Sequence, residues 1–210
     1  MRTTNSKSKF IIVSILGFIL FILLSFLVHR NVFTSFDFNN TVRIQNHIPS
    51  KFIGFFSTLS YVGEIQFATI IVLLILAIRR SLKSIVILFI FFFFHLFELY
   101  GKFFVEHKPP PNFMLKTQLP NNLPQFYVST QNSYPSGHAA RALFLTTIIY
   151  YLTSKTKFPA FSKILIYIFL TVYDILMLLS RVYLGEHWSS DVIGGLLLGL
   201  SMGLFAICFI

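Results

Sequence analysis

The sequence predicts an all-α, polytopic membrane protein with six transmembrane helices, built as a single domain over residues 1–210. Apolar residues make up 55% of the chain, 27 residues are phenylalanine and the mean hydropathy is +0.75, which is not the composition of an ordinary soluble domain. Only 11% of the residues are charged, yet the net charge is +10. Long apolar segments separated by short basic ones account for both observations.

The first predicted span covers residues 10–28, which include no charged side chain. A helix of this length rises about 28 Å, close to the bilayer's hydrocarbon core of roughly 30 Å. A cleavable signal peptide is the alternative, but its apolar region is usually shorter and ends in small residues. Here the segment ends in Leu27-Val28-His29-Arg30, so we expect a retained span. The polar residues 29–51 follow, with a turn expected at 37–40.

The remaining spans are expected at 52–78, 84–105, 138–152, 164–180 and 188–210, and Gly63-Glu64 interrupts the second one. Five of the eight prolines fall between residues 106 and 134, which predicts a loop because proline resists helix continuation. In the last span glycine recurs every four residues, at Gly195, Gly199 and Gly203. This spacing predicts close packing against a neighbouring helix, which we expect inside the chain rather than across a dimer.

The distribution of lysine and arginine predicts the orientation. Basic residues concentrate in segments 1–9, 79–83 and 155–163 and are sparse in the longer segments between them. By the positive-inside rule both termini are cytoplasmic, and the loops 106–137 and 181–187 lie at the outer face of the cell membrane. No basic helix with interleaved aromatics lies outside the apolar segments, so the bilayer, not nucleic acid, is the expected partner. A single cysteine, Cys208, allows neither an internal disulfide nor a cysteine metal cluster.

One candidate site begins at Pro135-Ser136-Gly137-His138, directly before an apolar run. The first N–H groups of a helix lack intrahelical partners and carry partial positive charge, which suits a bound phosphate. Ser136 can cap the helix, Gly137 lets a ligand approach the backbone, and His138 can transfer a proton. Proline and serine before an apolar run are also common at ordinary helix starts, so this motif alone is weak.

A second group of polar residues is Ser180-Arg181, then His187, then Asp191. Residues four apart lie on one helix face, so Asp191 can accept the proton of one imidazole nitrogen of His187. That contact would leave the other nitrogen free to attack, as in an oriented nucleophile or base. The guanidinium of Arg181 can hold two phosphate oxygens. Lys102, at the outer end of the third span, has two alternatives: its side chain extends to the membrane interface, or it points inward as a further cation for the same anion.

Together these motifs resemble the membrane branch of the type 2 phosphatidic acid phosphatase and haloperoxidase superfamily, directly over residues 95–195. That family has Lys-x6-Arg-Pro, then Pro-Ser-Gly-His, then Ser-Arg-x5-His-x3-Asp. The second and third motifs stand here unaltered. The first departs, because Pro109 occupies the arginine position counted from Lys102, while Pro110 keeps the proline. Lys108 and His107 are the two alternatives for supplying the lost charge.

The resemblance implies a phosphatase without a metal or other cofactor, acting through a phosphohistidine. By resemblance His187 is the nucleophile, Asp191 orients it, and His138 is the acid that later activates water. Glu106 or Glu186 is expected to keep His138 charged. The implied phosphate-binding groups are Lys102, Arg181, Ser136, Gly137 and Lys108.

The implied substrate is a lipid phosphate whose tail remains in the membrane. Polyprenyl or undecaprenyl diphosphate, phosphatidic acid and phosphatidylglycerol phosphate all fit, with a slight preference for the polyprenyl diphosphate because the chain is small. Two alternatives remain: a lipid-binding or lipid-transport protein that has lost catalysis, favoured by Pro109, and a vanadate-dependent haloperoxidase, disfavoured by six spans.

Ionisable residues inside the predicted spans default to a functional hypothesis. Glu98 precedes Lys102 by one helical turn, so an ion pair between them is expected. His95 and Glu64 are left without an assigned role.

Overall fold

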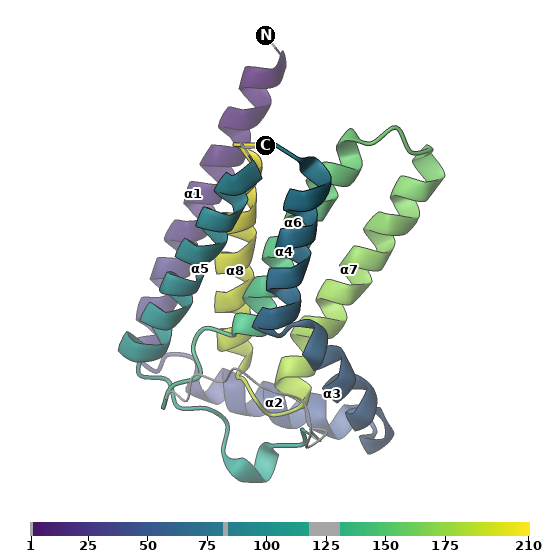
Figure 1. The fold of residues 1–210 in the computed structure, drawn as a ribbon. Helices are drawn as coiled ribbons and strands as arrows, with labels where there is room; N and C mark the ends of the chain where they lie inside the picture. The colour runs from purple at the N-terminus through teal and green to yellow at the C-terminus, as the bar shows by residue number, and fades with distance from the viewer. Residues whose placement is uncertain (1, 82–83, 118–130) are drawn as a thin grey trace.

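The computed structural model describes residues 2–81, 84–117 and 131–210 (Figure 1). Within these ranges the regular structure is entirely helical, which confirms the predicted fold class. The helices are α1 (Arg2–His29), α2 (Thr34–His47), η1 (Ser50–Phe52), α3 (Ile53–Val62), α4 (Ile65–Arg79), α5 (Ile85–Phe104), η3 (Asn112–Met114), α6 (Gly137–Lys155), α7 (Ala160–Tyr183) and α8 (Ser189–Ile207).

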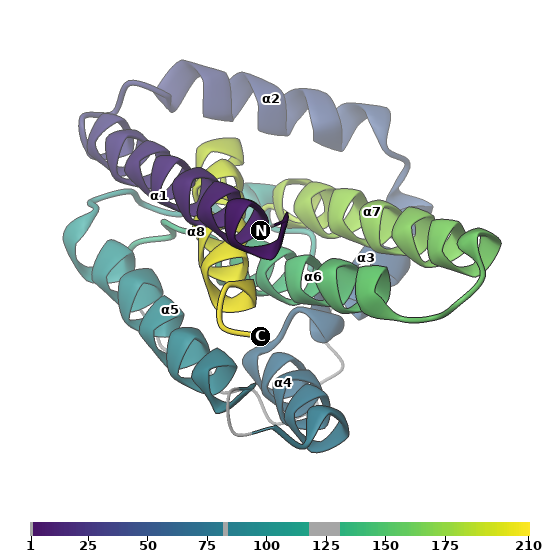
Figure 2. The ribbon, with the colours of Figure 1, turned by 90° about the horizontal axis from the view of Figure 1, so that it is seen from above.

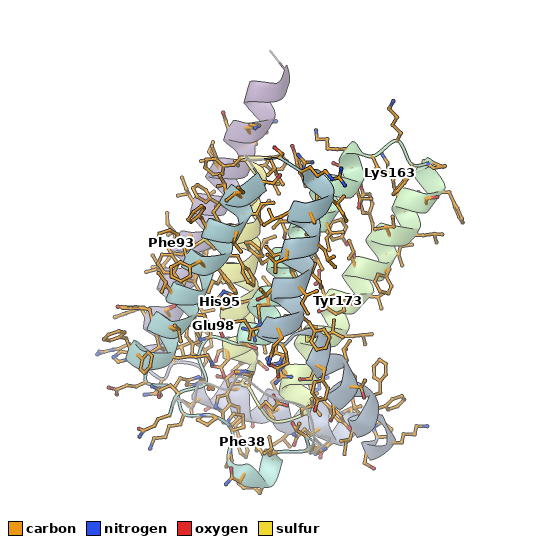
Figure 3. The ribbon with its side chains drawn as sticks, in the orientation of Figure 1. Phe38, Phe93, His95, Glu98, Lys163 and Tyr173 are labelled. Atoms are coloured by element: carbon orange, nitrogen blue, oxygen red, sulfur yellow. The ribbon has the colours of Figure 1, made fainter. Side chains whose placement is uncertain are left out.

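The long helices form one bundle, and α8 occupies its middle. Figure 2 shows α8 between α1, α5 and α6, and these three helices make most of its contacts. Both chain ends lie at the same end of the bundle, whereas α2 lies across the opposite end (Figure 1). Long apolar side chains project from the sides of the bundle, as Phe93 does in Figure 3. This distribution is typical of a protein whose sides face lipid.

Among the described residues, four helices are long and apolar enough to cross a membrane: α1 from Lys7, α5, α7 and α8. A fifth span results if η1, α3 and α4 are counted together across their bend of 48°. The segment expected as one helix over 52–78 is therefore two helices, because Glu64 is extended (φ −66°, ψ 152°) and begins α4 as its N-cap. The fourth predicted span, at 138–152, corresponds to α6, which does not meet these criteria, so the total of six spans stays a prediction.

The turn expected at residues 37–40 is wrong, because these residues lie inside α2. The helix is held by contacts with distant parts of the chain. Asp37 is buried and accepts hydrogen bonds from Ser190, and the Asn40 amide donates to the Ser189 hydroxyl over 2.6 Å. Gln45 donates to the carbonyls of Met114 and Tyr183. Tertiary packing, not local propensity, therefore stabilises this polar helix.

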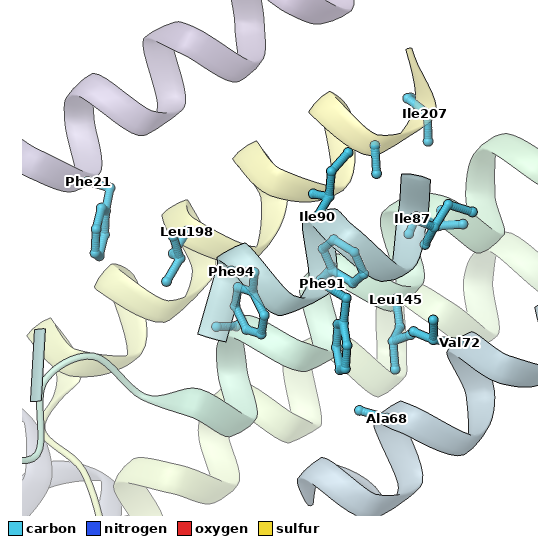
Figure 4. Packing of buried hydrophobic residues seen from close by; sticks show 14 of the residues in the cluster. Phe21, Ala68, Val72, Ile87, Ile90, Phe91, Phe94, Leu145, Leu198 and Ile207 are labelled. Carbon is cyan, nitrogen blue, oxygen red and sulfur yellow. The ribbon is translucent and has the colours of Figure 1, made fainter. Parts of the chain in front are cut away.

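The core lies between α8 and its neighbours. Figure 4 shows Phe91 and Phe94 of α5 pointing inward near Leu198 of α8, while Phe92 and Phe93 face outward and are exposed. The most extensive helix contact joins α6 to α8. The glycines of α8 lie in this contact, with Gly199 facing the Ala140 carbonyl, so the predicted packing inside the chain is confirmed.

Candidate active site

The predicted site residues meet at the end of the bundle that α2 covers. Helices α6 and α8 begin there, and α5 and α7 end there (Figure 1). The Ser136 N–H donates to the Asp191 carbonyl over 3.0 Å, which ties the start of α6 to the start of α8. Between α7 and α8 the chain turns at Gly185, whose φ of 72° glycine adopts without strain. Two motifs far apart in the sequence therefore form one cluster.

His187 and Asp191 are placed as the i, i+4 spacing predicted. His187 Nδ1 lies 3.5 Å from Asp191 Oδ2, longer than an ordinary hydrogen bond, and the same oxygen accepts from the Trp188 N–H over 2.9 Å. Burial lowers the pKa of His187 to about 4, although the adjacent Asp191 carboxylate raises it. At neutral pH the imidazole is therefore uncharged, the state in which a histidine nitrogen can act as a nucleophile.

His138 lies in the first turn of α6 and faces a carboxylate that the motifs did not indicate. His138 Nε2 lies 3.4 Å from Glu64 Oε1, at the break between α3 and α4. The expected partners were Glu106 and Glu186, and both expectations are wrong. Glu106 is exposed, and Glu186 pairs instead with Arg181. Gly63 allows this approach, because a Cβ there would come within 2.7 Å of the His138 ring.

Two cations reach the cluster. Arg181 is fully buried, donates to the Ser60 hydroxyl and pairs with Glu186. Lys102, near the end of α5, is partly buried and interacts electrostatically with Asp191 and Arg181. Both charges also act on His187. The charges of Arg181 and Lys102 therefore act on both histidines, an arrangement suited to a multiply charged anion.

The start of α6 differs in part from the prediction. The Ser136 hydroxyl is buried and has no hydrogen-bond partner within the described residues, so it is free to contact a ligand. Gly137 instead faces the protein interior, since a Cβ there would lie 2.0 Å from Glu98 Oε1. Glu98 forms its salt bridge with Arg141, over 3.0 Å, and interacts with its expected partner, Lys102, only electrostatically. Arg141 also donates to the Gly63 carbonyl over 2.8 Å, which links α5, α6 and the α3–α4 break.

The loop after α5 separates the two alternatives for the missing arginine. Lys108 is exposed. Its backbone carbonyl accepts a hydrogen bond from Trp188 Nε1 over 2.8 Å. His107 is buried, and its Nδ1 lies 2.8 Å from Asp191 Oδ1. The structure thus brings His107, not the Lys108 side chain, to the cluster. Part of the predicted loop, residues 118–130, falls outside the described residues.

Sequence reasoning missed Glu64, Ser60 and Asp37 as neighbours of the site. The only local signal was an ionisable residue, Glu64, at an interruption of an apolar segment. In the described parts of the chain, no group of three or more His, Cys, Asp or Glu side chains is arranged to hold a metal ion.

This fold and this cluster define a multi-pass membrane protein with a polar, cation-lined site at one end of its helical bundle. The chain belongs to the PAP2 superfamily, whose family model matches residues 83–210. It is 42% identical over 69 residues to phosphatidylglycerophosphatase B of Bacillus subtilis (strain 168), a match covering 32% of this chain and 34% of that protein. The matched part is thus about a third of the relative's length.

Two solved structures share the fold. One is a transmembrane PAP2-type phosphatidylglycerolphosphate phosphatase from Bacillus subtilis, with a TM-score of 0.74 and 24% identity over 92% of this chain and 94% of that one. The other is Aquifex aeolicus LpxE, with a TM-score of 0.61 and 21% identity over 82% of this chain and 94% of that one. At these identities the likeness extends to the fold alone.

Proposed function

We propose that this protein is a membrane lipid phosphatase that releases phosphate through a phosphohistidine at His187. The observation that carries the proposal is the buried His187, whose Nδ1 lies 3.5 Å from the Asp191 carboxylate and whose ring interacts electrostatically with Arg181 and Lys102. Membership of the PAP2 superfamily and the names of the relatives support the same reaction class. The names also put phosphatidylglycerol phosphate first among the candidate substrates, ahead of phosphatidic acid and polyprenyl diphosphate.

In the proposed reaction His187 Nε2 attacks phosphorus while Nδ1–H is held by Asp191. The bond from phosphorus to the leaving oxygen breaks, and His138 supplies the proton that this oxygen needs. His138 then removes a proton from water, which attacks the phosphohistidine and releases inorganic phosphate. Arg181 and Lys102 neutralise charge on the phosphoryl oxygens, and the Ser136 hydroxyl donates a hydrogen bond to one of them. Stabilising this charge is the main requirement of phosphoryl transfer.

The proposed location follows from the charge distribution. The termini lie at one end of the bundle and the cluster at the other (Figure 1). If the basic segments 1–9, 79–83 and 155–163 are cytoplasmic, the cluster opens to the outer face, at the level where lipid head groups lie. A lipid can then present its phosphate while its tail remains beside the apolar flank of the bundle.

The test is phosphate release by the purified protein in detergent, with EDTA present. The panel comprises phosphatidylglycerol phosphate, phosphatidic acid, a polyprenyl diphosphate and a water-soluble phosphomonoester. We expect EDTA-resistant release from at least one lipid, at least tenfold faster than from the soluble ester. Equal rates for soluble and lipid esters would contradict the lipid specificity. If no substrate of the panel releases phosphate, the lipid-binding or transport alternative is favoured. Pro109 in the first motif is the observation that supports this alternative.

Replacing Glu64 by glutamine is expected to lower kcat about tenfold at neutral pH. Its carboxylate lies 3.4 Å from His138 Nε2, and in the proposed reaction it supports the protonated ring that the leaving oxygen requires. One unit of pKa corresponds to about 1.4 kcal/mol, so losing one nearby charge has an effect of about this size. Steady-state phosphate release measures it. The matched control is Glu106→Gln, an exposed carboxylate with no contact to His138, which should keep full activity. The assignment is wrong if Glu106→Gln is the impaired variant.

A further inference from the structure

His107 lies against the carboxylate that orients the proposed nucleophile. It follows α5, is 7% exposed, and its Nδ1 lies 2.8 Å from Asp191 Oδ1. Because a carboxylate only accepts, Nδ1 carries the proton of this hydrogen bond. The other oxygen, Oδ2, accepts from the Trp188 N–H and faces His187 Nδ1. One carboxylate thus lies between two imidazole rings, one on each oxygen.

The other ring nitrogen of His107, Nε2, faces a second carboxylate. Its Nε2 lies 3.8 Å from Asp37 Oδ2, and Asp37 accepts hydrogen bonds from the N–H and the hydroxyl of Ser190, over 2.8 and 2.6 Å. The His107 carbonyl accepts from the N–H and the hydroxyl of Ser133. The ring therefore faces carboxylates from α2 and α8, and the backbone of His107 is held by the chain before α6. Asp37 and His107 also border a polar cavity of about 810 Å³, beside Lys108 and Trp188.

We propose that His107 is a positioning residue: its hydrogen bond to Oδ1 holds the Asp191 carboxylate so that Oδ2 faces His187. The inference rests on the proposed function, because it assigns the role of a residue within that site. A carboxylate rotates easily about its last bond, since this torsion has broad, roughly twofold minima. A donor on one oxygen removes that freedom and fixes the direction of the other. Burial opposes charge on His107, but the hydrogen bond and the charges of Asp191 and Asp37 raise its pKa.

This arrangement also bears on the first motif, in which Pro109 stands in place of the family's arginine. Both ring nitrogens of His107 face carboxylates, so the residue does not act as a second phosphate-binding cation. It acts through Asp191 instead. Groups that orient a ligating or catalytic side chain typically change activity by about 10–100-fold when removed, without touching the substrate.

The test compares His107→Ala with His107→Asn, whose amide nitrogen can donate near the place of Nδ1. We expect His107→Ala to lower kcat about 10–100-fold with KM changed less than about twofold. His107→Asn should recover most of the loss. When Asp191 is already alanine, removing His107 should lower kcat less than about twofold further, since residues that act as a unit are not additive. His47→Ala, an exposed histidine on α2, is the control.

Three results would overturn the proposal. A rise in KM at unchanged kcat would make His107 a head-group contact from the polar cavity. Equal losses in His107→Ala and His107→Asn, with a lower melting temperature in both, would leave only a structural role. Full activity in His107→Ala would remove any role.

A second readout does not depend on turnover. In protein labelled with ¹⁵N-histidine, His107→Ala should remove one downfield imidazole N–H signal and shift that of His187. His107→Asn should leave the His187 signal in place. If the wild-type protein releases no phosphate, the proposed function fails, while these spectra still decide whether His107 positions Asp191. An unchanged His187 signal in His107→Ala contradicts the inference.

Discussion

Replacing His187 by alanine is expected to abolish phosphate release, with a loss of kcat on the order of 10³–10⁶-fold, the range measured when a catalytic nucleophile is removed. His187 supplies the nitrogen that attacks phosphorus in the proposed reaction. Removing the ring leaves Arg181, Lys102 and His138 around the phosphate but no atom to attack it. Initial rates of phosphate release on the best lipid of the panel measure the effect.

The same variant separates catalysis from binding. Substrate should still bind, because Arg181 and Lys102 remain. The amount of lipid bound to purified His187→Ala protein should therefore be within about threefold of the amount bound to the wild type. A phosphorylated histidine trapped by rapid quenching should disappear. His47→Ala provides the control for losing a histidine elsewhere. If His187→Ala keeps more than a tenth of the wild-type kcat, His187 is not the nucleophile and the proposed mechanism is wrong.

Replacing Gly199 by alanine is expected to produce a large loss of stability and, with it, of activity. A Cβ at this position would lie 2.1 Å from the Ala140 carbonyl oxygen and 2.8 Å from its carbon. These are backbone atoms of α6, so no side chain can rotate away and the two helices must separate. Overpacking of this kind typically costs about 1–3 kcal/mol and occasionally more. For a chain of this size that lowers the melting temperature by roughly 2–12 °C.

Activity should fall with stability, because the same helix contact aligns the site. α6 begins with Ser136 and His138, and α8 begins near Asp191, so widening the contact moves His138 away from His187. A displacement of about 1 Å can cost about 100-fold in rate. Melting temperature in detergent and phosphate release are measured together. Gly54→Ala is the matched control, since a Cβ there meets nothing within 4 Å. Equal effects of the two substitutions would contradict the packing argument.

The local features of the site were predictable from sequence. His187 and Asp191 lie four residues apart around the start of α8, and a helix expected to begin near His187 predicted that the two side chains approach each other. Ser136 before an apolar run predicted a helix start, and the span expected from residue 138 begins one residue earlier, at Gly137. Gly199 and its glycine neighbours predicted close helix packing in the same way. Each of these signals depends on residues within one or two helical turns.

The pairing of distant charges was not predictable. Glu98 was expected to contact Lys102, one turn away, yet it pairs with Arg141 of α6, because the rotation of α5 directs its carboxylate into the bundle. Glu64 reaches His138 only because the chain breaks between α3 and α4. No periodicity in a sequence specifies how two helices are rotated against each other, so these contacts needed the tertiary structure.

The sequence by itself determined the helical membrane class, the positions of most spans and the residues that could carry chemistry, because hydropathy, helix starts and i, i+4 spacing are properties of short segments. Only the tertiary structure decided that residues 34–47 form a helix across the site, that Glu64 is the partner of His138, and that His107 lies against Asp191. These outcomes depend on how α2, α5 and α8 pack, and packing is settled by contacts between residues far apart in the chain.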